Sequence, residues 1–299
     1  MFVIAGATGH TGGVVASTLL AQGKPVTVLV RDSQKAETWR ERGARTASVS
    51  LEDPRALAGA LAGAEGAYLL IPPNYQAADV LAFGFRVGEG LAQAVKTSGV
   101  PQVVLLSSVG AQHAEGTGPI RMLHHAEAAM REATEHVTML RAAYFLENWG
   151  SGVEAVRNTG VLHNFQTADR KIPMVSTGDI GRVAAEYLTG PANGRRVVEL
   201  AGPEDYSPED IARTFAAALG KPVKLETHPL DGVVPTFTAL GFSPDLARLF
   251  REMVKGINTG HVAYEGHGAR FQRGRVTAAE AINRMLGLSA AARPGGGAA

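Results

Sequence analysis

Three evenly spaced glycines are the first residues of the sequence that could do chemistry. Gly6, Gly9 and Gly12 lie in GATGHTGG, between the apolar run FVIA and a helical pattern that ends at Gly23. Glycine inside a strand or helix costs about 0.5–1 kcal/mol relative to alanine, so the cluster needs a backbone reason. A tight turn alone is one such reason. A turn that opens a helix also presents free N–H groups and a positive dipole end, which together attract a phosphate.

The glycine turn belongs to a regular alternation of strand and helix patterns. Because neighbouring parallel strands need crossover connections, this alternation predicts an α/β fold with a parallel sheet covered on both faces. In such folds a glycine turn after the first strand binds the pyrophosphate of a dinucleotide. Strands are expected at residues 2–5, 25–31, 46–50, 66–73, 101–110 and 136–144, with helices at 12–22, 33–43, 53–63, 80–99 and 120–134.

The regular alternation of strand and helix patterns ends at about residue 150. One strand-to-helix return is visible in MVSTGDIGRVAAEYLTG, and a further strand in RVVELAG. A helix opened by Ser207, Pro208 and Glu209 and a helical pair from about 243 to 256 follow. We therefore expect a dinucleotide-binding domain at 1–150, a substrate lobe at 151–288 that partly returns to the sheet, and a disordered tail at 289–299.

Composition narrows the classes of function. The 29 basic and 28 acidic side chains give a net charge of +1, which does not fit binding to a nucleic-acid backbone. The absence of cysteine removes disulfides, thiolate metal sites and cysteine nucleophiles. No signal peptide and no unbroken apolar span are visible, so we expect a cytoplasmic protein without membrane contact. A small-molecule substrate and a monomer or homodimer fit this composition, and no metal is expected.

The end of the second expected strand bears on the choice of dinucleotide. An acid at this place binds the ribose hydroxyls of NAD, whereas an arginine pairs with the 2′-phosphate of NADP. Arg31 ends the strand and Lys35 follows one turn later, which favours NADP(H), with NAD(H) as the alternative. Asp32 instead favours NAD, because it is an acid near the same strand end. It also suits the N-cap of the helix that follows.

Further cofactor contacts are expected at the carboxyl ends of the strands, where open α/β sheets bind ligands. Each has a plain structural alternative: Asp53 suits the N-cap of a helix with Pro54 at its first position, and serine pairs are common in turns. The expected cofactor-binding residues are Gly6, Thr8, Gly9, His10, Thr11, Gly12, Arg31, Lys35, Asp53, Leu70, Ile71, Pro72, Ser107, Ser108 and Tyr144.

The segments GATGHTGG, VLVRD, LLSSVG, TMLRAAYFLENW and PMVSTGDIGRVAAEYL together resemble the NmrA-like group of atypical short-chain dehydrogenases. The resemblance covers most of the chain and is most specific in the nucleotide-binding part. It implies a Rossmann-type doubly wound sheet with a smaller C-terminal lobe that closes over the nicotinamide. The group includes NADPH-dependent quinone reductases, isoflavone-type reductases and redox-sensing regulators.

The proton donor is the least defined part of the expected site. Short-chain reductases usually carry a Tyr-x-x-x-Lys pair after the fifth strand, and GPIRMLHHAEAAM contains neither residue. The resemblance places the family's lysine or histidine near Leu123, so His124 and His125 are candidate acids, and Tyr144 is a second candidate. Alternatively, the two histidines are ordinary helix residues, one facing solvent and one packing against the sheet, and Tyr144 is an aromatic core residue. The side chains of adjacent histidines on a helix point in different directions, which disfavours a zinc site. Glu127 is expected to make a structural hydrogen bond.

Two functions of different classes remain open on the sequence. One is an oxidoreductase that passes a hydride from NADPH to a small apolar acceptor, such as a quinone, an azo compound or a conjugated carbonyl. These acceptors give stable reduced anions, so they need little acid catalysis from the protein. The alternative is a non-catalytic NADP(H)-binding redox sensor, which the missing Tyr-x-x-x-Lys pattern favours. Turnover of the reduced cofactor with some acceptor separates the two.

Overall fold

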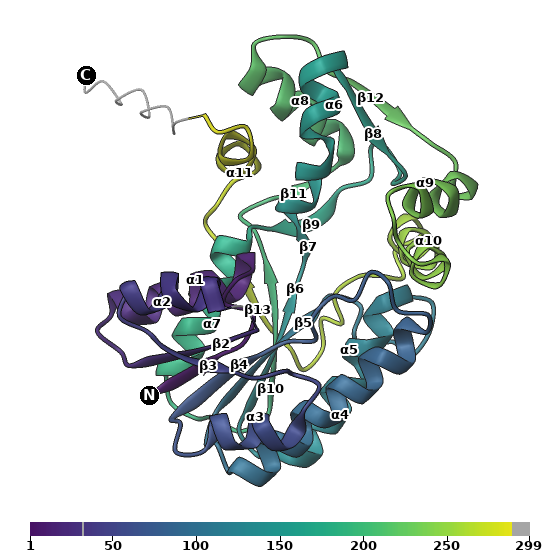
Figure 1. Cartoon of the computed structure of the whole chain (residues 1–299). Helices are drawn as coiled ribbons and strands as arrows, with labels where there is room; N and C mark the ends of the chain where they lie inside the picture. The colour runs from purple at the N-terminus through teal and green to yellow at the C-terminus, as the bar shows by residue number, and fades with distance from the viewer. Residues whose placement is uncertain (32, 289–299) are drawn as a thin grey trace.

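A parallel sheet of eight strands forms the centre of the molecule (Figure 1). The computed structural model describes residues 1–31 and 33–288, so Asp32 and the expected tail at 289–299 lie outside the described residues. The strand order is β13-β10-β6-β5-β4-β1-β2-β3, with every neighbouring pair parallel. The strands are β1 (Phe2–Ile4), β2 (Val26–Val30), β3 (Arg45–Ser48), β4 (Gly66–Leu69), β5 (Val103–Ser108), β6 (Val137–Ala142), β10 (Arg196–Ala201) and β13 (Arg270–Arg273).

Helices cover both faces of this sheet, as its buried apolar strands require. One face packs against α1 (His10–Ala21), α2 (Ser33–Glu41) and α7 (Thr177–Thr189), and the other against α3 (Pro54–Leu61), α4 (Val80–Ser98) and α5 (Arg121–Ala133). The predicted Rossmann-type α/β fold is therefore confirmed. The strand order reverses between β1 and β4, and ligands bind outside the carboxyl ends of the strands at such a point.

A smaller lobe lies beyond the carboxyl edge of the sheet (Figure 1). It contains a three-stranded and a two-stranded sheet, and its core surrounds Trp149, Met174, Phe215 and Ile282. Its strands are β7 (Tyr144–Phe145), β9 (Ile172–Val175) and β11 (Asp205–Tyr206), then β8 (Val161–Asn164) and β12 (Lys224–Thr227). Its helices are α6 (Val153–Thr159), α8 (Pro208–Leu219), α9 (Val233–Ala239), α10 (Pro244–Thr259) and α11 (Ala278–Met285), with short 3-10 turns η2 (Leu146–Gly152) and η3 (Leu230–Gly232). A further 3-10 turn, η1 (Gly118–Ile120), directly precedes α5.

Two features of the second half differ from a simple reading of the sequence. The expected helical pair at 243–256 is wrong: Ser243 caps one continuous helix, α10, which continues through Gly256 to Thr259 and ends at Gly260, whose φ of +82° is left-handed. The strand β13 joins the edge of the central sheet and was not expected. The domain division at residue 150 stays a prediction. None of the described helices is both long and apolar enough to cross a bilayer.

Candidate functional site

The glycine turn between β1 and α1 requires residues that have no side chain. A Cβ at Gly12 would lie 2.4 Å from the carbonyl oxygen of Ala5 and 2.5 Å from that of Gly6, so the helix could not approach the strand. Gly6 adopts a φ of +65°, and a Cβ there would lie 2.7 Å from Leu70 Cδ2. Glycine is thus needed at both positions to bring the start of α1 close to the end of β1.

The start of α1 is built like an anion site. Gly9 is its N-cap, no described side chain caps the helix, and its first turn carries no acidic residue. Thr8, Gly9 and His10 are exposed at the tip of the turn. A helix start with these properties offers N–H groups and a positive dipole end to a pyrophosphate. These residues therefore fit a dinucleotide.

Thr11 plays a different part from its neighbours. Its side chain is buried, and its hydroxyl oxygen lies 2.9 Å from the buried Tyr68 hydroxyl, which donates to it. Burial raises the pKa of Tyr68, so this phenol stays protonated and keeps the hydrogen bond. The Thr11 side chain thus ties α1 to β4, while a role of Thr11 in cofactor binding stays a prediction.

The expected ribose-binding residues lie near the carboxyl ends of β2 and β3. Arg31 directly follows β2, and both Arg31 and Lys35 are exposed. Asp53 is the N-cap of α3, and its Oδ1 accepts hydrogen bonds of 3.0 Å from the N–H groups of Arg55 and Ala56. The predicted capping role of Asp53 is confirmed, and a contact with adenine stays a prediction.

An apolar cavity of about 350 Å³ lies at the carboxyl ends of β4 and β5, under the lobe. It brings together five of the expected cofactor residues, namely Leu70, Ile71, Pro72, Ser107 and Ser108. The lobe contributes Phe145 and two residues of α10. Such a cavity suits a flat apolar ligand held by a few polar groups. The complete lining is Leu70, Ile71, Pro72, Pro73, Asn74, Tyr75, Val80, Phe83, Leu106, Ser107, Ser108, Pro119, Ile120, Met122, Leu123, Phe145, Leu246 and Phe250.

A buried ion pair supports the polar side of this cavity. The Ser107 hydroxyl donates to Glu127 Oε1 at 2.5 Å, and Arg141 donates to both Glu127 oxygens at 2.9 and 2.7 Å. Arg141 Nη1 also reaches Glu265 Oε2 at 2.6 Å. Burial would lower the pKa of Arg141, but the hydrogen bonds and charges of Glu127 and Glu265 more than offset it and raise that pKa. Glu127 is therefore a structural partner that orients Ser107.

The three candidate proton donors do not line the cavity. His124 Nδ1 lies 2.8 Å from the carbonyl oxygen of Ala111, and His125 Nε2 lies 2.9 Å from Glu89 Oε1 on the neighbouring helix α4. Tyr144 is half-buried against the lobe core, and burial raises its pKa to about 12. None of the three is among the residues that line the cavity with Ser107, and their catalytic role stays a prediction.

Sequence reasoning missed the lobe side of the cavity. Asn74 and Tyr75 come from the loop before α4, while Leu246 and Phe250 come from α10. Tyr75 is the one titratable side chain in the lining, and it stacks on Phe242 with ring centroids 5.0 Å apart. The proline-rich stretch IPPNY was a local signal for a loop at a strand end. Nothing local showed which helix would pack against it.

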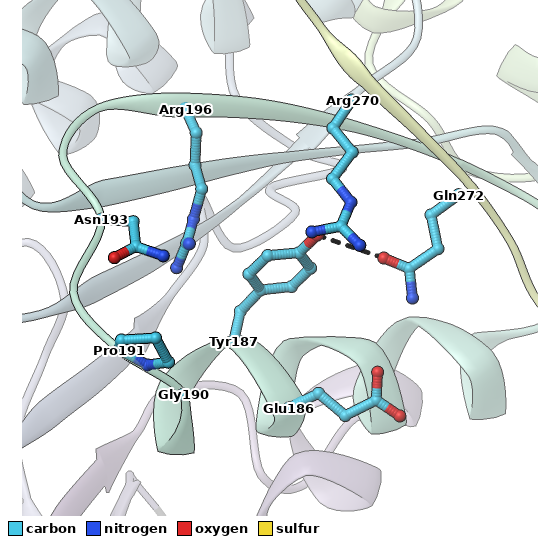
Figure 2. Close-up of a pocket in the computed structure, with 8 residues that line it drawn as sticks. All are labelled: Glu186, Tyr187, Gly190, Pro191, Asn193, Arg196, Arg270 and Gln272. Atoms are coloured by element: carbon cyan, nitrogen blue, oxygen red, sulfur yellow. Dashed lines mark hydrogen bonds between the residues drawn. The ribbon is translucent and has the colours of Figure 1, made fainter.

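A second cavity, of about 280 Å³, lies at the opposite, amino edge of the sheet (Figure 2). Arg196 and Arg270 are the first residues of β10 and β13, and the Arg196 guanidinium lies 4.6 Å from the centre of the Tyr187 ring. The Tyr187 hydroxyl donates to Gln272 Oε1 at 3.2 Å. This polar cavity is separate from the glycine turn, because parallel strands put their first and last residues at opposite edges.

Comparison with known proteins identifies the family to which this chain belongs. The model of the NmrA-like family matches residues 1–262. The chain belongs to the NmrA-like family. The resemblance expected from the sequence is thereby confirmed, since the match covers the glycine turn, both sides of the apolar cavity and most of the lobe.

Two relatives that match most of the chain carry the names of an azoreductase and a quinone oxidoreductase. The NAD(P)H azoreductase of Xenophilus azovorans is 26% identical over 253 residues, which cover 85% of this chain and 86% of that protein. Quinone oxidoreductase 2 of Escherichia coli is 24% identical over 267 residues, covering 87% and 89%.

Solved structures show the same fold. The Escherichia coli NADPH-dependent quinone oxidoreductase in complex with NADPH matches with a TM-score of 0.79 at 22% identity, covering 96% of this chain and 100% of that one. The triphenylmethane reductase of a Citrobacter species matches with a TM-score of 0.80 at 18% identity, covering 96% and 99%.

Proposed function

We propose that the protein is an NADPH-dependent reductase that transfers a hydride to a small apolar acceptor. The observation that carries this proposal is the apolar cavity beside the glycine turn, because its polar lining residues are two serines, one tyrosine and one asparagine, with no carboxylate, lysine or histidine. The relatives named above act with NAD(P)H or NADPH, which agrees with the enzyme class and cofactor expected from the sequence.

The residues present fit the cofactor. NADPH, when bound, supplies the hydride. The start of α1 would hold the pyrophosphate through N–H groups that no described side chain caps. Arg31, exposed after β2, would pair with the 2′-phosphate, which NAD lacks. Ser107 and Ser108 would border the nicotinamide from the end of β5.

The lining also limits the acceptor. A simple ketone needs a positioned proton donor as its alkoxide forms, and the cavity lining contains no histidine, carboxyl group or lysine to serve as one. A quinone, an azo compound or a conjugated carbonyl gives a more stable reduced anion, which can take its proton from water. The aromatic side chains of Phe145 and Phe250 suit flat acceptors of this kind.

The test is NADPH oxidation by the purified protein with quinones, azo dyes, enones and simple ketones, with NADH in parallel. We expect turnover with at least one of the first three classes and little with simple ketones. Tight NADPH binding without turnover of any acceptor would support a redox sensor and contradict the proposal. Fast reduction of simple ketones would instead contradict the argument from the lining.

Two variants separate the proposed site from the alternative proton donors. Tyr144→Phe and His124→Gln should leave turnover with a good quinone acceptor within about twofold of wild type, because neither side chain lines the cavity. A loss of kcat by about 100-fold in either variant would show that a proton donor outside the lining acts in the reaction.

A further inference from the structure

Two histidines and one glutamate meet on the two-stranded sheet of the lobe, far from the cofactor site. Strands β8 and β12 are parallel, and their register places Glu226 opposite His163. His228 directly follows β12, two residues after Glu226, and alternate residues of an extended segment project to the same side. The backbone pairing therefore brings His163 together with two potential metal ligands that lie 63 and 65 residues later in the sequence.

The distances between these side chains suit a small cation. His163 Nδ1 lies 2.9 Å from His228 Nε2, and His228 Nε2 lies 3.9 Å from Glu226 Oε1. One ligand atom from each residue lies within 4.8 Å of the other two. Ligand atoms about 2.0–2.2 Å from a tetrahedral zinc are roughly 3.3 Å apart, so small side-chain rotations would complete the arrangement.

The surroundings hold His228 in place. Its backbone N–H donates to the carbonyl oxygen of Asn164 at 2.7 Å, and the centroid of its ring lies 5.7 Å from that of Phe165. His163 is exposed and Glu226 and His228 are half-buried, so the open side of the cluster faces water. A cation here would keep a water molecule as its fourth ligand.

We propose that His163, Glu226 and His228 form a binding site for a divalent cation of the zinc class. Two imidazole nitrogens and one carboxylate are a donor set that Zn²⁺ favours over Mg²⁺ or Ca²⁺, which prefer oxygen ligands. The hydrogen bond between the two histidines occupies the space where the cation would bind, so binding replaces a shared proton. The site would link β8 to β12 and does not depend on the proposed reductase activity.

A second histidine pair provides a control within the same chain. The rings of His113 and His261 stack with centroids 4.1 Å apart, but these residues belong to no group of three potential ligands in the described part of the chain. If any two neighbouring histidines sufficed, this pair would bind zinc equally well.

The experiment is titration of the full-length, metal-stripped protein with ZnCl₂ by isothermal calorimetry, using protein without a histidine tag. We expect one Zn²⁺ per chain and an increase in Tm on adding zinc. His163→Gln and His228→Gln should each weaken binding by at least about 10- to 100-fold, since loss even of an outer-shell partner has an effect of that size. Glu226→Gln should weaken it in the same direction.

The control variant His261→Gln should keep the affinity and stoichiometry of the wild type. Undiminished zinc binding in both His163→Gln and His228→Gln, or no binding at all by the wild type, would overturn the proposal. Far-UV circular dichroism and Tm without metal check that each variant folds. Because His163 is exposed, its substitution should leave the metal-free Tm nearly unchanged.

Discussion

At the scale of single residues, the proposed cofactor site depends on glycines that leave room for the backbone and on one cationic side chain. Gly12 lets α1 approach the carbonyl groups of Ala5 and Gly6, and Arg31 stands exposed after β2. The first feature concerns the phosphates that all nicotinamide dinucleotides share. The proposed role of Arg31 concerns the 2′-phosphate that only NADP carries, so the two features can be tested separately.

Arg31→Ala should weaken NADPH binding by about tenfold or more, the scale of one hydrogen bond to a charged group, and leave NADH binding nearly unchanged. The measurement is the dissociation constant of each cofactor by fluorescence titration. Arg40→Ala is the matched control, because Arg40 on α2 pairs with Glu37 away from the strand end. Equal losses for NADPH and NADH would reject the assignment of Arg31 to the 2′-phosphate.

Gly12→Ala should impair both cofactor binding and stability, because its Cβ would meet two backbone carbonyls that cannot rotate away. Gly59→Ala in α3 is the matched control, since its Cβ would have no neighbour within 4 Å. The control should be neutral or more stable by about 0.5–1 kcal/mol, since alanine favours the helix. Thermal unfolding and NADPH titration of both variants measure this. Normal NADPH affinity in Gly12→Ala would contradict the need for close approach.

At the scale of elements, the ion pair between Glu127 and Arg141 joins α5 to β6. Both side chains are buried, so each depends on the other for compensation of its charge. Ser107 at the end of β5 donates to the same carboxylate, which extends this link to the cavity. Glu127 of α5 thereby holds the hydroxyl of Ser107, which borders the proposed nicotinamide position.

Glu127→Gln should destabilise the protein by about 3–5 kcal/mol, because it leaves the buried Arg141 without its main partner. Urea unfolding monitored by circular dichroism gives the free energy of unfolding. The control Glu132→Gln, at an exposed position of the same helix, should change it by less than about 0.5 kcal/mol. Similar values for the two variants would show that the pair contributes little.

At the scale of the whole molecule, the lobe closes the cavity by docking onto the loop before α4. The N–H of Val80 donates to Asp245 Oδ2 at 2.9 Å, and the N–H of Ser243 donates to the carbonyl oxygen of Tyr75 at 2.8 Å. These contacts hold the start of α10, and with it Phe250, over the cavity. The proposed dinucleotide site lies mostly on the central sheet, so the lobe should affect acceptor binding more than cofactor binding.

Phe250→Ala should raise KM for a quinone or azo acceptor by roughly tenfold, the scale of lost apolar contacts in a pocket, with little change in NADPH affinity. Leu240→Ala is the control, because Leu240 is 68% exposed and does not line the cavity. Steady-state kinetics with saturating NADPH measures KM. An unchanged KM together with weaker NADPH binding would reassign this wall of the cavity to the cofactor.

The sequence by itself determined those features that depend on neighbouring residues. The alternation of apolar strands and helices, the glycine turn, the capping by Asp53 and the helix opened by Ser207 are each set by local backbone chemistry, and the structure has all of them. The helical pair at 243–256 failed because two adjacent helices and one long helix share the same hydrophobic period.

Only the tertiary structure decided which distant residues meet. Phe250 and Leu70 line the same cavity, Arg141 pairs with Glu127, and His163 lies beside His228, although no local pattern links the members of these pairs. Each contact depends on strand order, register or the docking of the lobe. Those follow from burying apolar surface throughout the molecule, so they could not be read from any short stretch of the chain.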